Sequence, residues 1–179
     1  MDHVTIFLIL YMTLLISCNG FDATQPNCFD VIDYGAVGDG MTDDSGAFLK
    51  AWTVVCGTDP STAPTLIIPS GKTFLLKPMK FNGPCNHQNV NVEVSGNIVA
   101  PDAISGYEGE DQVWLYFIGI DRLNIYGTGQ IDGRGSVWWQ KSTSIYYQDE
   151  DQYEMSNQQR PTALYFHRCN GFQLSGPTI

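Results

Sequence analysis

The sequence predicts an all-β fold of the solenoid type, with one short helix near the start of the chain. An internal repeat carries the prediction: residues 115–127 (LYFIGIDRLNIYG) align without gaps to residues 164–176 (LYFHRCNGFQLSG). A third, weaker copy (VNVEVSG) ends at Gly96 and matches only the alternating part. Stacked coils bury apolar surface that a single coil cannot bury, so a repeated unit of strand, turn and strand is typical of a solenoid.

The helix is expected over residues 43–55. Its apolar residues recur at a helical spacing: Phe48, Trp52 and Val55. Thr42 or Asp43 can cap its start by accepting hydrogen bonds from free N–H groups, and Asp44 favours the positive end of the helix dipole. Because a solenoid needs its open end covered, we expect this helix to cap the first coil.

Two strands follow the helix, at residues 65–68 and 73–76, and residues 69–72 (PSGK) form a turn by composition. In the repeat, alternation places Leu123 and Ile125 on one face of a strand. Asp121 and Asn170 lie where the chain must turn, and both residue types tolerate left-handed or side-chain-bonded turns.

The two main copies of the repeat are separated by more residues than one plain coil contains. We therefore expect an insertion between them, and the polar, acidic stretch 141–160 is the obvious place. An antiparallel sandwich is the alternative fold, because alternation suits its strands as well.

The first 20 residues resemble a secretory signal peptide. Residues 4–17 form an apolar block without a charge, too short for a membrane span but suited to the core of a signal peptide. Cleavage after Gly20 is our expectation, although Asp2 and the lack of an early Lys or Arg make a poor n-region. We thus divide the chain into a signal peptide, residues 1–20, and part of a single domain, residues 21–179. An uncleaved membrane anchor remains the alternative.

Cleavage would leave four cysteines, Cys28, Cys56, Cys85 and Cys169, which allow three complete pairings. An oxidising compartment favours disulfides. Cys56 and Cys85 flank one compact stretch of strands and turns, so we expect these two to pair first. Their spacing has no CxxC character, which argues against zinc. Cys169 is either a buried thiol or lacks its partner.

The formal net charge of −10 makes nucleic acid a poor partner, because phosphate backbones are anionic too. An acidic polysaccharide would also be repelled overall. A face that binds one therefore needs a local cluster of the few basic side chains, and Lys141, Arg160 and Arg168 are candidates.

Asp43 and Asp44 are adjacent carboxylates and invite an acid–base assignment. Glycoside chemistry requires two carboxyl groups across the scissile bond, whereas neighbours on the first turn of a helix are solvated and point apart. Helix capping explains both residues. Together with Asp33 and Asp39 they could suggest calcium, but the spacing does not match an EF-hand loop.

Other candidate motifs also have structural explanations. Gly127, Gly129 and Gly133 have the spacing GxGxxxG, which is not that of a dinucleotide loop, and we expect them to serve bends between coils. His87 and His167 lack a neighbouring nucleophile with a paired carboxylate, so surface or packing roles are expected. Trp138 and Trp139 could stack on sugar rings, but we expect them to pack at the base of the insertion.

Several motifs occur in a fixed order: DYGAVGDG (33–40), TDDS (42–45), GTGQIDGRG (127–135) with the Trp pair, and RPTAL (160–164). Together they resemble the N-terminal part of the plant-type polygalacturonases of glycoside hydrolase family 28, over about residues 28–179. The resemblance implies a secreted right-handed parallel β-helix, which we expect to be incomplete at its C-terminus. It also implies inverting hydrolysis of α-1,4-linked galacturonan in pectin of the cell wall, by a monomer that uses no cofactor or metal.

Catalysis in that family relies on Asn-Thr-Asp, Asp-Asp, Gly-His-Gly and Arg-Ile-Lys motifs. None of them can be placed in these 179 residues, because the only Asp-Asp pair is the one assigned to the helix start. We therefore assign no catalytic, cofactor-binding or metal-binding residue and expect the chain to be inactive alone. It is the N-terminal part of an active hydrolase, a truncated product without function, or a β-helix that binds carbohydrate or serves a structural role without catalysis.

Overall fold

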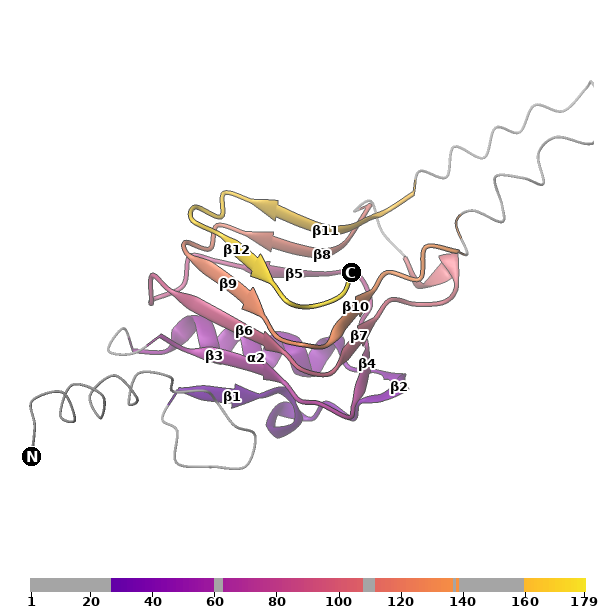
Figure 1. Cartoon of the computed structure of the whole chain (residues 1–179), viewed down its shortest axis with the longest axis horizontal. Coiled ribbons are helices and arrows are strands. Elements are labelled where there is room, and N and C mark those ends of the chain that lie inside the picture. Colours follow the sequence, from indigo (N-terminus) through magenta and orange to yellow (C-terminus); the bar gives the residue numbers. More distant parts are fainter. Residues whose placement is uncertain (1–26, 60–62, 108–111, 137, 139–159) are drawn as a thin grey trace, which may run out of the picture.

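A computed structural model describes residues 27–59, 63–107, 112–136, 138 and 160–179. Its strands form three sheets in which every neighbouring pair is parallel (Figure 1). Sheet A consists of β1 (Cys28–Asp30), β3 (Thr65–Ile68), β6 (Val90–Val94), β9 (Leu123–Tyr126) and β12 (Gln173–Ser175). Sheet B consists of β2 (Asp39–Asp43), β4 (Thr73–Leu75), β7 (Asn97–Val99) and β10 (Gln130–Asp132). Sheet C consists of β5 (Met79–Asn82), β8 (Val113–Ile118) and β11 (Thr162–His167).

The second, third and fourth coils each pass through the three sheets in the same order, A then B then C, before the next coil begins. The fold is therefore the expected parallel β-helix, and the antiparallel sandwich is excluded for these strands. Two short 3-10 helices, η1 (Val31–Tyr34) and η2 (Ile104–Gly106), lie in the connections.

The repeat seen in the sequence is the stacking of one coil on the next. Leu164, Tyr165 and Phe166 lie opposite Leu115, Tyr116 and Phe117, and Leu174 lies opposite Ile125, which is the register that the gapless alignment predicted. The weaker third copy is strand β6, which pairs with β9 on the side of β9 away from β12.

The long connections all lie at one corner of the coil, between sheets B and C. The connection at this corner is short in the second coil, where it spans residues 76–78. It is long in the third and fourth coils, where it spans residues 100–112 and 133–161. The insertion expected at 141–160 falls in the last of these, although only Arg160 of that stretch is among the described residues.

The helix α2 (Ser45–Gly57) takes the place in the first coil that a sheet C strand takes in the later coils. It contacts β5, β3, β1 and η1, and Figure 1 shows it at the end of the stack that holds β1 and β3. Phe48, Trp52 and Val55 are buried as their spacing predicted. Trp52 packs edge-on against Phe81 with ring centroids 5.1 Å apart. The predicted helix is thus confirmed, with a start two residues later than expected.

The start of α2 differs from the predicted capping in one respect. The Oδ1 atom of Asp43 accepts a hydrogen bond from the Ser45 N–H at 3.1 Å, as a capping carboxylate does. Asp44 is the N-cap residue, yet its side chain makes no cap hydrogen bond. Its two oxygens instead accept the N–H groups of Val37 at 2.7 Å and Gly38 at 3.1 Å. These two hydrogen bonds connect the preceding loop to the start of the helix, and the Asp44 side chain is buried between them.

The turn between sheets C and A lies where it was predicted, but Asp121 and Asn170 do not adopt left-handed conformations. The positive-φ residues are their neighbours: Gly119, Arg122, Arg168 and Gly171. Asn170 Nδ2 donates to Asp121 Oδ1 at 2.9 Å. These two side chains therefore join successive coils rather than bend the chain.

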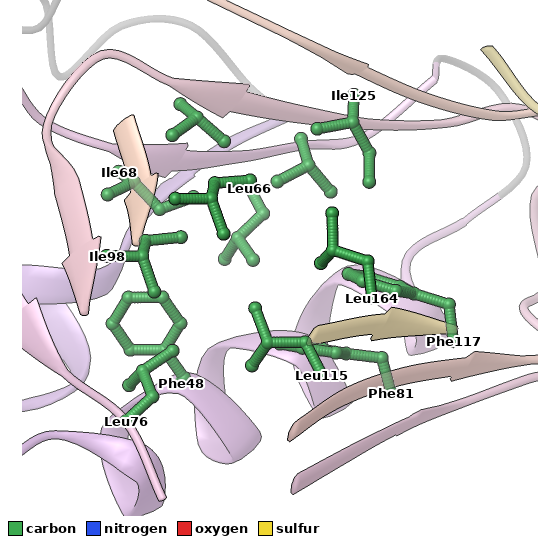
Figure 2. Close-up of a pocket in the computed structure, with 13 residues that line it drawn as sticks. Phe48, Leu66, Ile68, Leu76, Phe81, Ile98, Leu115, Phe117, Ile125 and Leu164 are labelled. Atoms are coloured by element: carbon green, nitrogen blue, oxygen red, sulfur yellow. The ribbon is translucent and has the colours of Figure 1, made fainter. Parts of the chain in front are cut away.

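The interior of the coils is an apolar core. Figure 2 shows side chains from all three sheets and from α2 pointing into it, among them Phe48, Leu66, Ile98, Phe117 and Leu164. Phe81 and Phe117 stack with ring centroids 4.5 Å apart, and Phe117 and Phe166 with 5.2 Å. The remaining void is about 20 Å³ and has no polar lining. A dry apolar void of this size is a packing feature, not a ligand site.

The expected disulfide joins Cys56, in the last turn of α2, to Cys85, after β5. Cys169 is a free thiol whose Sγ lies 3.6 Å from the Phe117 carbonyl oxygen.

Replacing Cys56 and Cys85 with serine should lower the free energy of unfolding by about 3 kcal/mol, because the disulfide restricts the unfolded chain. Urea unfolding would measure this, with Cys169→Ser as a control that loses less than about 1 kcal/mol. A double variant as stable as the parent would contradict the prediction.

Candidate functional site

The outer face of sheet C carries aromatic and basic side chains in register. Met79, Phe81 and their equivalents point inward, so the alternate residues of each strand point outward. Lys80, Tyr116 and Tyr165 are opposite one another on β5, β8 and β11, and Asn82, Ile118 and His167 form the next row. We call Lys80, Tyr116, Tyr165 and His167 the tyrosine face.

Tyr116 contacts each of the other three side chains. The Tyr116 and Tyr165 ring centroids are 5.1 Å apart at an interplanar angle of 64°. The Tyr116 hydroxyl is hydrogen-bonded to His167 Nδ1 at 2.9 Å. Lys80 Nζ lies 5.8 Å from the centroid of the Tyr116 ring, within the range of a cation–π contact. Tyr165 is 45% exposed, so this ordered cluster faces solvent.

A cavity of about 460 Å³ lies at the corner where the long connections leave the coils. Tyr107, Trp114 and Trp138 supply its aromatic lining, and Asp132 and Arg160 also line it. The Tyr107 and Trp138 rings meet edge to face at 5.2 Å, and burial raises the pKa of Tyr107 to about 12. Asp132 Oδ1 accepts the Arg134 N–H at 2.8 Å, so its carboxylate supports the local turn.

The predicted packing of Trp138 is confirmed, since this side chain is only 8% exposed; Trp139 lies outside the described residues. The three basic candidates do not form one cluster among the described residues. Arg160 lines the corner cavity, Arg168 follows His167 at the end of β11, and Lys141 is outside the described part.

The aspartates of the N-terminal motif have structural partners. Asp43 Oδ2 pairs with Lys77 Nζ at 3.2 Å. Burial raises the pKa of the Asp43 carboxyl, but hydrogen bonds from Ser45 and Lys77 outweigh it and leave the pKa below the usual value. Asp39 accepts the N–H groups of Met41 and Thr42, which lowers its pKa as well. Neither Asp43 nor Asp44 is therefore placed for acid–base chemistry.

The remaining candidate residues also have structural roles. His87 Nδ1 accepts the Asn89 N–H at 2.9 Å within a turn. Gly127 and Gly129 lie at the bend between sheets A and B, against the backbone of the coil below. Position 133 does not require a glycine, because a Cβ on Gly133 would make only ordinary van der Waals contact with Ala163. Among the residues that the structure describes, no group of three His, Cys, Asp or Glu side chains could hold a metal ion.

Sequence reasoning singled out His167 but missed Lys80, Tyr116 and Tyr165. A signal was present, because the repeat aligns Tyr116 with Tyr165 and alternation puts both opposite to the apolar face. Lys80 could not be found that way, since β5 has no recognisable copy of the repeat.

The architecture is that of a parallel β-helix with an apolar interior. The family model for glycosyl hydrolases family 28 matches residues 56–179. The chain is 43% identical over 156 residues to a probable polygalacturonase of Arabidopsis thaliana and 38% identical over 149 residues to a polygalacturonase of Malus domestica. These alignments cover 87% and 83% of this chain, and 30% of each relative.

The chain therefore belongs to glycosyl hydrolase family 28, and it spans about a third of the length of the curated relatives that it matches. Among solved structures it resembles an exopolygalacturonase from Thermotoga maritima, with a TM-score of 0.59 and 20% sequence identity over 85% of this chain and 41% of that one. At this identity the likeness supports the fold alone. The described residues contain no helix long and apolar enough to cross a membrane.

Proposed function

We propose that this chain supplies the N-terminal coils of a polygalacturonase, which hydrolyses the α-1,4-galacturonosidic bonds of pectin with inversion. The observation that carries the proposal is membership of glycosyl hydrolase family 28, together with identities of 43% and 38% to plant polygalacturonases. Two carboxyl groups across the scissile bond perform this chemistry. They belong to motifs that do not occur in these 179 residues.

We further propose that residues 1–20 are a signal peptide and that residues 21–179 form part of one β-helix domain of a monomer in the extracellular space and cell wall. The uncharged apolar block at residues 4–17 supports secretion. The disulfide between Cys56 and Cys85 supports it independently, because such bonds persist in oxidising compartments. Polygalacturonan is the proposed partner, without nucleic acid or cofactor.

The mature chain alone should release no reducing ends from polygalacturonate, because it carries none of the family's catalytic motifs. A reducing-end assay measures this, with the Malus domestica polygalacturonase as the positive control and a mock purification as the blank. Turnover above the blank would overturn the assignment of catalysis to residues outside this chain.

The function itself is tested by sequencing the transcript through the codon for Ile179 to its stop. A frame that continues into the Asn-Thr-Asp, Asp-Asp, Gly-His-Gly and Arg-Ile-Lys motifs, and whose product hydrolyses polygalacturonate, supports the proposal. A frame that continues into them and yields a folded but inert product would refute it.

A further inference from the structure

Two Asn-Gly pairs lie in the described part of the chain, and their surroundings differ. Asn82 and Gly83 stand at the end of β5, whereas Asn170 and Gly171 lie in the turn between β11 and β12. Asparagine is chemically labile, because the backbone nitrogen of the next residue can attack its side-chain carbonyl carbon. A following glycine favours this attack, because it has no side chain to obstruct the approach and its backbone rotates freely.

The first pair is held by the strands around it. The Gly83 N–H donates to the Ile118 carbonyl at 2.8 Å, and the Asn82 carbonyl accepts the Trp52 Nε1–H at 3.0 Å. The nitrogen that would attack the Asn82 side chain is therefore engaged in a hydrogen bond. Rearranging this backbone requires that bond to break.

The second pair lacks this restraint. Asn170 and Gly171 are both exposed, and Gly171 has a φ of 69°. Among the residues that the structure describes, the Gly171 N–H donates to no backbone carbonyl. The Asn170 side chain donates to Asp121 Oδ1 at 2.9 Å, but this hydrogen bond is on the surface, where water competes for both partners. The attacking nitrogen and the side chain are thus both available at this turn.

We propose that Asn170 is a site of spontaneous deamidation, and that this reaction loosens β12 from the preceding coil. The Gly171 nitrogen forms a bond to Asn170 Cγ, the bond from Cγ to Nδ2 breaks, and the proton of the Gly171 N–H leaves with Nδ2 as ammonia. Water then opens the cyclic imide to an aspartate or an isoaspartate. The only co-reactant is water, and the inference does not rest on the proposed function.

Both products disturb the contact between the third and fourth coils. Each replaces the amide donor with a carboxylate, which faces the Asp121 carboxylate across a distance that is 2.9 Å in the parent. Like charges this close repel each other. The isoaspartate also lengthens the backbone just before β12, whose Leu174 lies opposite Ile125 of β9. The Arg122 N–H donates to the Asn170 carbonyl at 2.7 Å, so the same change strains a second bond between the coils.

Peptide mass spectrometry tests the reaction after the folded chain has been incubated in mildly alkaline buffer. Trypsin cuts after Arg168, so residues 169–179 form a peptide with a single Asn, and deamidation adds about 1 Da to it. Asn170 should convert at least about 10-fold faster than Asn82, the matched control in the same molecule. In urea the strands no longer protect Asn82, so the two rates should agree within about 3-fold.

Thermal unfolding tests the consequence. Asn170→Asp, which reproduces the aspartate product, should lower the Tm by about 2–4 °C. Adding Asp121→Asn should restore most of the loss, because the pair then again has one amide and one carboxylate. The Tm of the incubated parent should fall in step with its conversion. Asn170→Gln is the control for incubation, because a longer side chain forms the ring more slowly, and its Tm should stay constant.

Three results would overturn the inference. The first is an Asn170 that remains unmodified in the folded chain while it converts in urea. The second is equal conversion of Asn82 and Asn170 in the folded chain, which would show that the strands do not select the site. The third is an Asn170→Asp variant with the Tm of the parent, which would show that the reaction leaves the coils coupled.

Discussion

Replacing Gly127 with alanine should destabilise the chain by about 4 kcal/mol or more and leave little folded protein. Gly127 has a φ of 135°, a conformation that L-residues with a side chain rarely adopt. A Cβ at this position would also collide with the backbone of Val94 in the coil below. The Cβ would meet backbone atoms, which cannot move aside as the end of a flexible side chain can. The collision is therefore relieved only if the two coils separate, which would disrupt the hydrogen-bonded ladder between β6 and β9.

Urea unfolding followed by circular dichroism measures this loss, and Gly46→Ala is the control. Gly46 lies in the first turn of α2, has no positive φ, and a Cβ there would meet no atom within 4 Å. Alanine is the better helix former, so this variant should gain about 0.5 kcal/mol. A Gly127→Ala variant within about 1 kcal/mol of the parent would show that the bend accommodates a side chain.

Replacing Asp44 with alanine should lower the free energy of unfolding by about 3 kcal/mol. Its carboxylate, on a residue only 2% exposed, accepts the Val37 and Gly38 N–H groups. Removal leaves two backbone donors without a partner, at about 1–3 kcal/mol for each buried group. Asp44→Asn should lie between the alanine variant and the parent, because an amide offers one accepting oxygen instead of two.

Asp33→Ala is the matched control, since it removes an exposed carboxylate from the same region and should change stability by no more than about 0.5 kcal/mol. The two variants carry the same net charge, so a general electrostatic effect would move both alike. Equal stabilities would therefore contradict the specific role of Asp44.

The stacking of the coils could be predicted from the sequence, because coils that stack in register must carry similar residues at equivalent positions. That constraint made residues 115–127 and 164–176 alike, and their pairing follows the alignment. The helix was predictable because its apolar residues have a local period. The orientation of the Asp44 side chain was not, since its partners are set by the path of the loop at residues 35–38 and not by the helix.

The tyrosine face was only half predictable for the same reason. Tyr116 and Tyr165 occupy equivalent positions in the repeat, whereas Lys80 joins them only through the pairing of β5 with β8. Stacking across coils is a tertiary property, and β5 is too short and too different in sequence to reveal it.

The corner between sheets B and C could accept grafted loops. The ladder of sheet B is complete before the long connections begin, as the Ala100 N–H donates to the Asp132 carbonyl at 2.9 Å. The ladder of sheet C resumes as they end, where the Thr162 N–H donates to the Gln112 carbonyl at 2.7 Å. Each doubling of loop length costs only about 0.6 kcal/mol in closure entropy. Loop exchange at this corner would therefore be an economical way to engineer new specificities on an unchanged scaffold.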